Sequence, residues 1–117
     1  MISLRFLTVL LFVPLLAACQ PEHKSSYDSW TGRWQGPEGT YLDLQKSEAD
    51  DEYNVVIADL DGPRTFKGHT TDEGIMYARN GATEIIKAGN GQATGMKWLA
   101  DKKNCLVVKA GEGFCRD

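Results

Sequence analysis

The chain has 117 residues, of which 42% are hydrophobic and 25% charged, and its formal net charge is −3 at pH 7. This length allows one domain with a modest core. The mildly acidic balance argues against nucleic acid as a partner, because phosphate binding calls for clustered Lys and Arg.

An apolar segment with the parts of an export signal opens the chain: a positive start at Arg5, an apolar run over 6–16 and small residues before Cys19. The run is broken by Pro14 and is shorter than the roughly 20 apolar residues that a membrane-spanning helix needs. We therefore predict that residues 1–18 are a signal peptide. Its removal takes away Arg5 and no acid, so the formal charge changes from −3 to −4.

The junction Leu16-Ala17-Ala18-Cys19 resembles the lipobox of bacterial lipoproteins. The resemblance implies cleavage before Cys19 and acylation of this cysteine with fatty acids such as palmitate. Multiple acylation makes such an anchor stable, since one chain gives only marginal membrane binding. In this family an aspartate after the cysteine favours the inner membrane, so Gln20 implies the outer membrane. We expect the domain to face the periplasm, although a lipobox specifies anchoring and not final exposure.

A polar stretch follows the lipidated cysteine, and we predict that residues 19–28 form a flexible tether. The nine residues after Cys19 reach about 30 Å when extended and average about 16 Å as a coil. His23 is interpreted as a solvated residue of this tether. The tether holds the domain, residues 29–117, close to the membrane.

Short β-prone runs separated by turn signals fill the rest of the chain, and none keeps helical periodicity. This spacing predicts an all-β fold, either a small antiparallel β-barrel or a sandwich, of about seven to nine short strands. The expected strands are Trp30–Gln35, Thr40–Lys46, Tyr53–Leu60, Arg64–Thr70, Ile75–Arg79, Thr83–Ala88, Thr94–Leu99, Cys105–Ala110 and Gly113–Arg116. The strongest hairpin signal is Asn80-Gly81.

Alternation along these runs predicts which side chains face the core. The pairs expected to face inward are Leu42 with Leu44, Val55 with Ile57, and Ile75 with Tyr77, joined by Ile85 across the Asn80-Gly81 hairpin. The run over 105–110 is apolar on both faces. We therefore expect it to be central, or to have its outer face covered by another element.

Two cysteines, Cys105 and Cys115, remain once Cys19 is assigned to lipid, and pairing is the default in an oxidising compartment. A metal or redox pair needs closer spacing or more ligands than the chain offers. We predict a disulfide across a final hairpin, with Leu106 opposite Phe114. On the chain-entropy account this bridge adds about 2.5 to 3 kcal/mol.

The stretch Gly32-Arg33-Trp34 resembles the first strand of lipocalin-like (calycin-like) and avidin-like barrels. In those barrels the tryptophan closes one end and a distant basic residue packs over it. The resemblance implies Trp34 as the closing residue and Arg116 as its cation–π partner. Small barrels are filled by their own side chains, which leaves little room for a ligand.

Catalytic and metal-binding patterns are not found. His69 is the only histidine of the domain and has no partner at a diagnostic spacing. The acidic run over 48–52 lacks the spacing of a cation loop, and 59–62 lacks the further ligands of a calcium site. We expect no enzymatic activity, no metal and no cofactor.

The segment over 94–104 is richer than a structural role demands. It contains Met96, Trp98 and the lysines Lys97, Lys102 and Lys103 directly before the disulfide hairpin. Aromatic and flexible apolar residues beside charges are typical of protein-binding hot spots. The alternative is a strand with Met96 and Trp98 in the core and the lysines in solvent. On the functional interpretation, the lysines and Trp98 form a rigid edge that enters a partner's acidic cleft.

Three functions from different classes remain for this sequence, and the third, an enzyme, has no catalytic pattern in its favour. We expect first a non-enzymatic, lipid-anchored envelope protein that binds another protein. In size, anchor and β-rich character the chain is similar to lipoprotein-type periplasmic lysozyme inhibitors, which implies inhibition of a cell-wall hydrolase. The alternative is a lipocalin-like carrier of a small apolar ligand. An inhibitor depends on Lys97 and Trp98, whereas a carrier depends on inward residues such as Ile57 or Tyr77.

Overall fold

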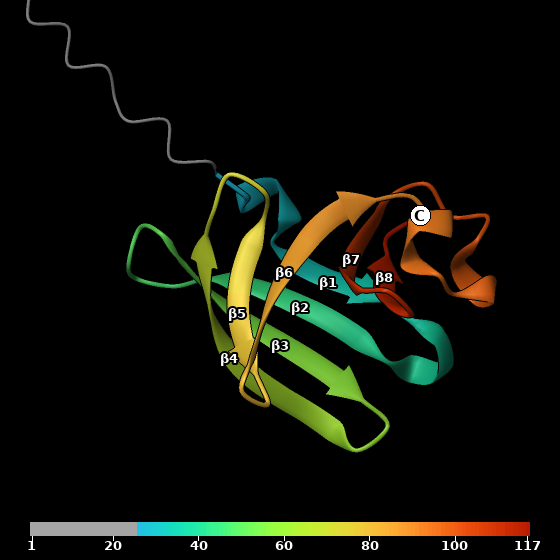
Figure 1. The fold of residues 1–117 in the computed structure, drawn as a ribbon, viewed down its shortest axis with the longest axis horizontal. Coiled ribbons are helices and arrows are strands. Elements are labelled where there is room, and N and C mark those ends of the chain that lie inside the picture. Colours follow the sequence, from blue (N-terminus) through green and yellow to red (C-terminus); the bar gives the residue numbers. More distant parts are fainter. Residues whose placement is uncertain (1–25) are drawn as a thin grey trace, which may run out of the picture.

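Eight strands form a closed antiparallel barrel in the computed structural model, which describes residues 26–117 (Figure 1). The strands are β1 (Gly32–Gln35), β2 (Tyr41–Lys46), β3 (Glu52–Asp59), β4 (Gly62–Thr70), β5 (Ile75–Arg79), β6 (Ala82–Gly89), β7 (Cys105–Lys109) and β8 (Glu112–Cys115). Short 3₁₀ turns accompany them: η1 (Asp28–Trp30), η2 (Pro37–Gly39), η3 (Gln92–Thr94) and η4 (Lys97–Leu99). The predicted all-β fold is confirmed, and of the two architectures the barrel is the correct one.

Several sequence predictions lie outside the described residues. They are the signal peptide over 1–18, the lipidation site Cys19 and the first part of the tether. Within residues 26–117, the structure contains no helix that is long and apolar enough to cross a membrane.

The last two residues predicted for the tether, Tyr27 and Asp28, belong to the folded domain. The hydroxyl of Tyr27 donates to the carbonyl oxygen of Thr71 at 2.5 Å, and the hydroxyl of Tyr53 donates to Asp28 at 2.6 Å. Tyr27 and Trp30 also pack against the core. The folded domain therefore begins a few residues earlier than the sequence predicts, because η1 covers one end of the barrel.

Alternating side chains occupy the barrel interior. The buried core consists of Trp34, Leu42, Leu44, Tyr53, Val55, Ile57, Ile75, Tyr77, Ile86, Leu106, Val108 and Phe114. The three inward pairs that alternation predicts on β2, β3 and β5 are all buried. These side chains have period two because successive residues of a strand point to opposite faces.

The prediction that Ile85 faces inward is wrong, and Ile86 takes that position. Asn80 and Gly81 have φ angles of 53° and 78° and form the two-residue turn that their sequence predicts. The turn sets the register of the hairpin, so that Ile75 pairs with Ile86 and Tyr77 with Glu84. An acidic side chain therefore faces the interior beside Tyr77.

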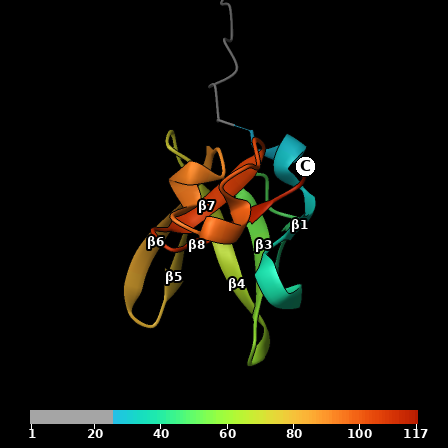
Figure 2. The ribbon, with the colours of Figure 1, turned by 90° about the vertical axis from the view of Figure 1, so that its right-hand side faces the viewer.

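The two ends of the barrel differ (Figure 2). The chain enters at the end that η1 covers. The opposite end, which we call the mouth, is formed by the connections β1–β2, β3–β4, β5–β6 and β7–β8. Closure between β1 and β8 is thin, because Gln35 opposite Cys115 is the residue pair that joins these two strands.

The final hairpin confirms the predicted disulfide and register. Cys105 is bonded to Cys115 and lies directly opposite it, and Leu106 lies opposite Phe114. The outer face of β7 is apolar as predicted, and it is covered. Cys105, Cys115 and Leu99 form a second buried cluster on this outer side.

The predicted strand Thr94–Leu99 is wrong, since these residues contribute to η3 and η4 instead. Gly95 has a φ of 70° and interrupts any extended run. The buried hydroxyl of Thr94 donates to the carbonyl oxygen of Gly91 at 2.5 Å and accepts from the backbone N–H of Met96 at 3.1 Å. Such local bonds compete with a strand ladder and favour tight turns.

Candidate functional site

The segment over 90–104, which we call the platform, crosses the outside of the final hairpin. The backbone N–H of Gly91 donates to the carbonyl oxygen of Lys102 at 2.7 Å, which closes the segment on itself. The N–H of Gly111 donates to the carbonyl oxygen of Thr94 at 2.8 Å and ties it to the β7–β8 turn. With the nearby disulfide, these bonds hold the platform in one conformation.

Two glycines allow the close packing of the platform. A Cβ atom on Gly91 would lie 1.6 Å from the carbonyl oxygen of Leu99. A Cβ atom on Gly113 would lie 2.4 Å from Cγ2 of Thr94. Both distances are far below van der Waals contact, so the platform can approach itself and β8 only because these residues lack side chains.

Trp98 lies on η4 of the platform, and 77% of it is exposed. The alternative in which Trp98 is a core residue of a strand is therefore excluded. Lys97 and Lys103 are also exposed and have no ion pair within residues 26–117. Met96 is partly buried and packs against the outer cluster of Leu99 and the disulfide. The structure thus places Trp98 and two free ammonium groups on one rigid segment.

Lys102 differs from the other two platform lysines because it is engaged. Its ammonium donates to the main-chain oxygen of Asp117 at 2.5 Å. The carboxylate of Asp117 accepts from the backbone N–H groups of Lys103 and Asn104 at 2.7 and 3.1 Å. These backbone hydrogen bonds hold the pKa of Asp117 below its ordinary value. These hydrogen bonds to Asp117 therefore hold residues 102–104 of the platform in place.

Trp34 and Arg116 lie together at the closed end of the barrel. The guanidinium of Arg116 is 4.0 Å from the centre of the Trp34 ring, within cation–π range. It donates to the carbonyl oxygens of Ser29, Trp30 and Thr31. The indole of Trp34 donates to the carbonyl oxygen of Trp30 at 2.8 Å. This cluster joins Arg116 to η1.

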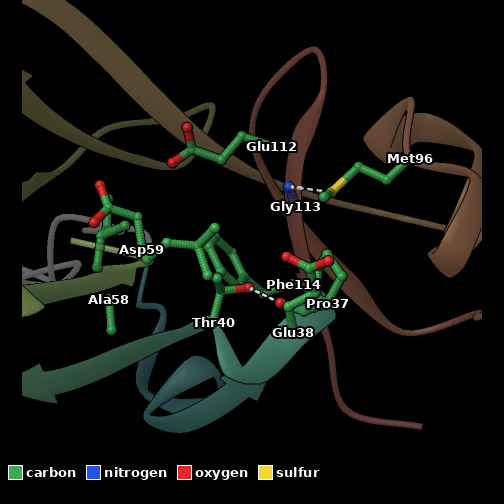
Figure 3. Close-up of a pocket in the computed structure, with 11 residues that line it drawn as sticks. Pro37, Glu38, Thr40, Ala58, Asp59, Met96, Glu112, Gly113 and Phe114 are labelled. Atoms are coloured by element: carbon green, nitrogen blue, oxygen red, sulfur yellow. Dashed lines mark hydrogen bonds between the residues drawn. The ribbon is translucent and has the colours of Figure 1, made fainter. Parts of the chain in front are cut away.

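A pocket with a volume of about 260 Å³ opens at the mouth, between β8 and η2 (Figure 3). Its apolar lining includes Pro37, Ile57, Met96 and Phe114. Leu60, 76% exposed, lies at its edge. The pocket exists because β8 pairs with β1 only near Cys115, so the earlier part of β8 faces a turn instead of a strand.

Three carboxylates also line the pocket, and two of them are already paired. Asp59 accepts from Arg64 at 3.0 Å, and Glu112 accepts from Arg79. Glu38 is exposed and has no ion pair within the described part of the chain. Its φ of 58° is an unusual backbone conformation for a residue with a side chain. Glu38 is therefore the free acidic group of this pocket.

A buried ionic cluster lies behind the pocket. Arg79, only 6% exposed, donates to both carboxylate oxygens of Glu112 at 2.8 and 3.0 Å, and its Nη2 lies 2.9 Å from Glu84. The hydroxyl of Tyr77 donates to Glu84 at 2.5 Å. Burial, together with this bond to a carboxylate, raises the pKa of Tyr77, and the bond to Glu112 raises the pKa of Arg79. The cluster pairs its charges internally.

The sequence analysis missed both the pocket and the ionic cluster. The pocket residues come from distant segments, so no local pattern marks them. One signal in the sequence could have revealed the ionic cluster. Arg79 lies two residues after the inward-facing Tyr77 on the same strand, so alternation predicts that its charged side chain also faces the barrel interior.

No group of three or more His, Cys, Asp or Glu side chains in residues 26–117 is arranged to hold a metal ion. The ring of His69 is half-exposed on β4, 4.0 Å from Glu52.

The two surface features that stand out are thus the platform with Trp98 and the mouth pocket. Comparisons of this chain with protein-family models, with curated proteins and with solved structures find no match.

Proposed function

We propose that this protein is a non-enzymatic, lipid-anchored protein of the bacterial outer membrane that acts by binding another protein through the platform. The proposed partner class is a cell-wall hydrolase with an acidic cleft. The observation that carries the proposal is the exposure of Trp98 on a rigid segment. The anchor rests on the sequence around Cys19.

Burial of an exposed tryptophan against a partner contributes strongly to binding affinity. A tryptophan buries about 150 to 250 Å² when it is covered, and truncation of a hot-spot residue costs about 2 kcal/mol or more. Because hydrogen bonds and a disulfide already fix the platform, little conformational entropy is lost when a partner binds. Rigid aromatic side chains of this kind are typical hot-spot residues.

The charges beside Trp98 favour an acidic partner. Lys97 and Lys103 carry free ammonium groups, which an acidic cleft would attract. Enzymes that hydrolyse glycans use a pair of carboxylates in their cleft. Such hydrolases act on the cell wall, next to the membrane at which the predicted lipid at Cys19 would hold this domain.

Inhibition assays on a lysozyme-type glycosidase test the proposal. We expect the lipid-free protein from residue 20 onward to slow cell-wall hydrolysis at stoichiometric concentrations. The variant Trp98→Ala should raise the half-inhibitory concentration at least tenfold, whereas Leu60→Ala, an equally exposed apolar residue outside the platform, should not. Absence of inhibition for every glycan hydrolase tested, or equal inhibition by Trp98→Ala, would refute this partner class.

Anchoring is tested independently of partner binding. The full chain should fractionate with outer membranes, and Cys19→Ser should release it or leave it unprocessed. A Cys19→Ser protein that is cleaved like the parent and still remains as firmly bound to outer membranes would contradict the lipid anchor.

A carrier of a small apolar ligand is the second candidate, and the mouth pocket is the observation that favours it. Its lining is largely apolar, but its 260 Å³ lies below the range of about 300 to 1,000 Å³ of typical ligand sites. The barrel interior itself is occupied by core side chains. Native mass spectrometry of protein purified from its own envelope would show the extra mass of such a ligand.

A further inference from the structure

The platform and the mouth pocket have complementary properties, although they belong to the same chain. One presents an exposed tryptophan beside a free lysine, and the other is an apolar pocket beside a free glutamate. We propose that two copies of this chain associate by placing Trp98 of each copy in the mouth pocket of the other. This inference rests on the proposed role of the platform in protein binding and adds a second copy as a partner for it.

Size and lining suit a single large side chain. The pocket is smaller than sites for drug-sized ligands, and its apolar wall includes Ile57 and the ring of Phe114 (Figure 3). An indole inserted there would contact an aromatic ring, an arrangement that adds to the value of apolar burial. The exposed Leu60 at the edge would be covered at the same time.

The free charges specify how the two copies meet. Lys97 is adjacent to Trp98 in the sequence, and Glu38 lies in the pocket lining. Neither forms an ion pair within residues 26–117, whereas Asp59 and Glu112 already have arginine partners. In the dimer, Lys97 of one copy would face Glu38 of the other. Such a pair contributes orientation more than affinity.

The position of Met96 makes the exchange reciprocal. Met96 lines the pocket and is two residues from Trp98, so the Cα atoms of the two residues are at most about 7.6 Å apart. The tryptophan and the pocket therefore lie on neighbouring parts of one surface. A two-fold axis beside them lets each copy give and receive one tryptophan, which closes the contact as a dimer and prevents open chains.

Dimer formation would cover the platform. A hydrolase and a second copy would then compete for Trp98, so self-association would regulate the proposed inhibitory activity. On a membrane the two-dimensional confinement of anchored copies raises their effective concentration and favours the dimer.

Sedimentation analysis with tryptophan fluorescence tests the dimer. We use the lipid-free protein from residue 20 onward, because residues 26–117 form a complete barrel with its own core. We expect a monomer–dimer equilibrium and a blue shift of emission as the concentration rises. The shift reports Trp98, since Trp34 is buried in the monomer and Trp30 is partly buried.

Variants identify the contact. Trp98→Ala should weaken self-association by about 30-fold, the effect of a hot-spot truncation. Lys97→Glu and Glu38→Lys should each weaken it, and the double variant should restore it, because the swap rebuilds the ion pair in the opposite sense. Lys87 is an exposed lysine of β6 outside both surfaces. The control variant Lys87→Glu should leave self-association unchanged and should not restore it when combined with Glu38→Lys.

The outcomes separate this inference from the proposed function. A chain that stays monomeric, dimerises equally well with Trp98→Ala, or shows no rescue by the charge swap refutes the dimer. A monomer whose pocket holds a small molecule refutes it as well. Glu38→Lys should keep hydrolase inhibition, since Glu38 lies outside the platform. Inhibition without self-association therefore leaves the proposed function standing, and self-association without inhibition leaves the dimer standing.

Discussion

Replacing Arg79 with methionine tests whether the ionic cluster behind the pocket is as tightly coupled as its geometry indicates. The change keeps an elongated side chain and removes the cation that lies between Glu84 and Glu112. Breaking a buried ion pair in this way costs about 3 to 5 kcal/mol, because uncompensated charge is left behind. Glu112 is one quarter exposed and Lys109 lies 3.9 Å from both carboxylates, so we expect the lower end, about 3 kcal/mol.

Urea denaturation at pH 7, followed by circular dichroism, measures this loss. Arg64→Met is the matched control, because Arg64 pairs with Asp59 at a similar distance, 3.0 Å, but half in solvent. A surface pair contributes only about 0 to 1 kcal/mol, so this control should remain close to the parent. The triple variant Arg79→Met with Glu84→Gln and Glu112→Gln should recover much of the lost stability, since no buried charge then remains unpaired.

Two outcomes would refute this reasoning. An Arg79→Met protein whose stability lies within about 1 kcal/mol of Arg64→Met would show that the cluster is not energetically coupled. A triple variant that is no more stable than Arg79→Met would show that unpaired carboxylates are not the cause of the loss.

Three further predictions concern stability. Replacing Cys105 and Cys115 with alanine should lower the unfolding free energy by about 2.7 kcal/mol relative to the disulfide-bonded parent, on the chain-entropy account of a ten-residue loop. The reduced parent should show the same loss. The hydrogen bond from Tyr53, then Lys46, holds the pKa of Asp28 below its ordinary value, so its contribution is present above about pH 4 and is lost as the pH falls through the lowered pKa. Asp28→Asn should therefore flatten the acid limb of the stability curve, and an unchanged limb would contradict this role. Asn80→Ala should lower Tm at a cost of about 1 to 2 kcal/mol because its φ is 53°, whereas Asn80→Gly should leave Tm near the parent value.

Local chemistry explains why much of the barrel could be predicted. The pair Asn80-Gly81 strongly favours a two-residue hairpin turn, because both residues tolerate positive φ. The buried residues of β2 and β3 follow from the two-residue period of a strand alone. The disulfide followed from the compartment rule and from counting cysteines. These features depend on residues that are close in sequence or on a single pairing.

The predictions that failed depend on longer-range structure. Thr94–Leu99 has the composition of a strand, but its backbone follows the hydrogen bonds of Thr94 and the close approach at Gly91. Exposure of Trp98 was one of two alternatives, because alternation does not distinguish a strand from a pair of tight turns. The mouth pocket has no local signature, since it arises where β8 fails to pair with β1.

The thin closure between β1 and β8 also has a consequence for how the protein forms. The strands that must meet are the first and the last of the barrel, and Arg116 must then reach the carbonyl oxygens of η1. These contacts join residues far apart in the sequence, so a long loop must close before they form. We therefore expect closure of the barrel between β1 and β8 to be a late step of folding.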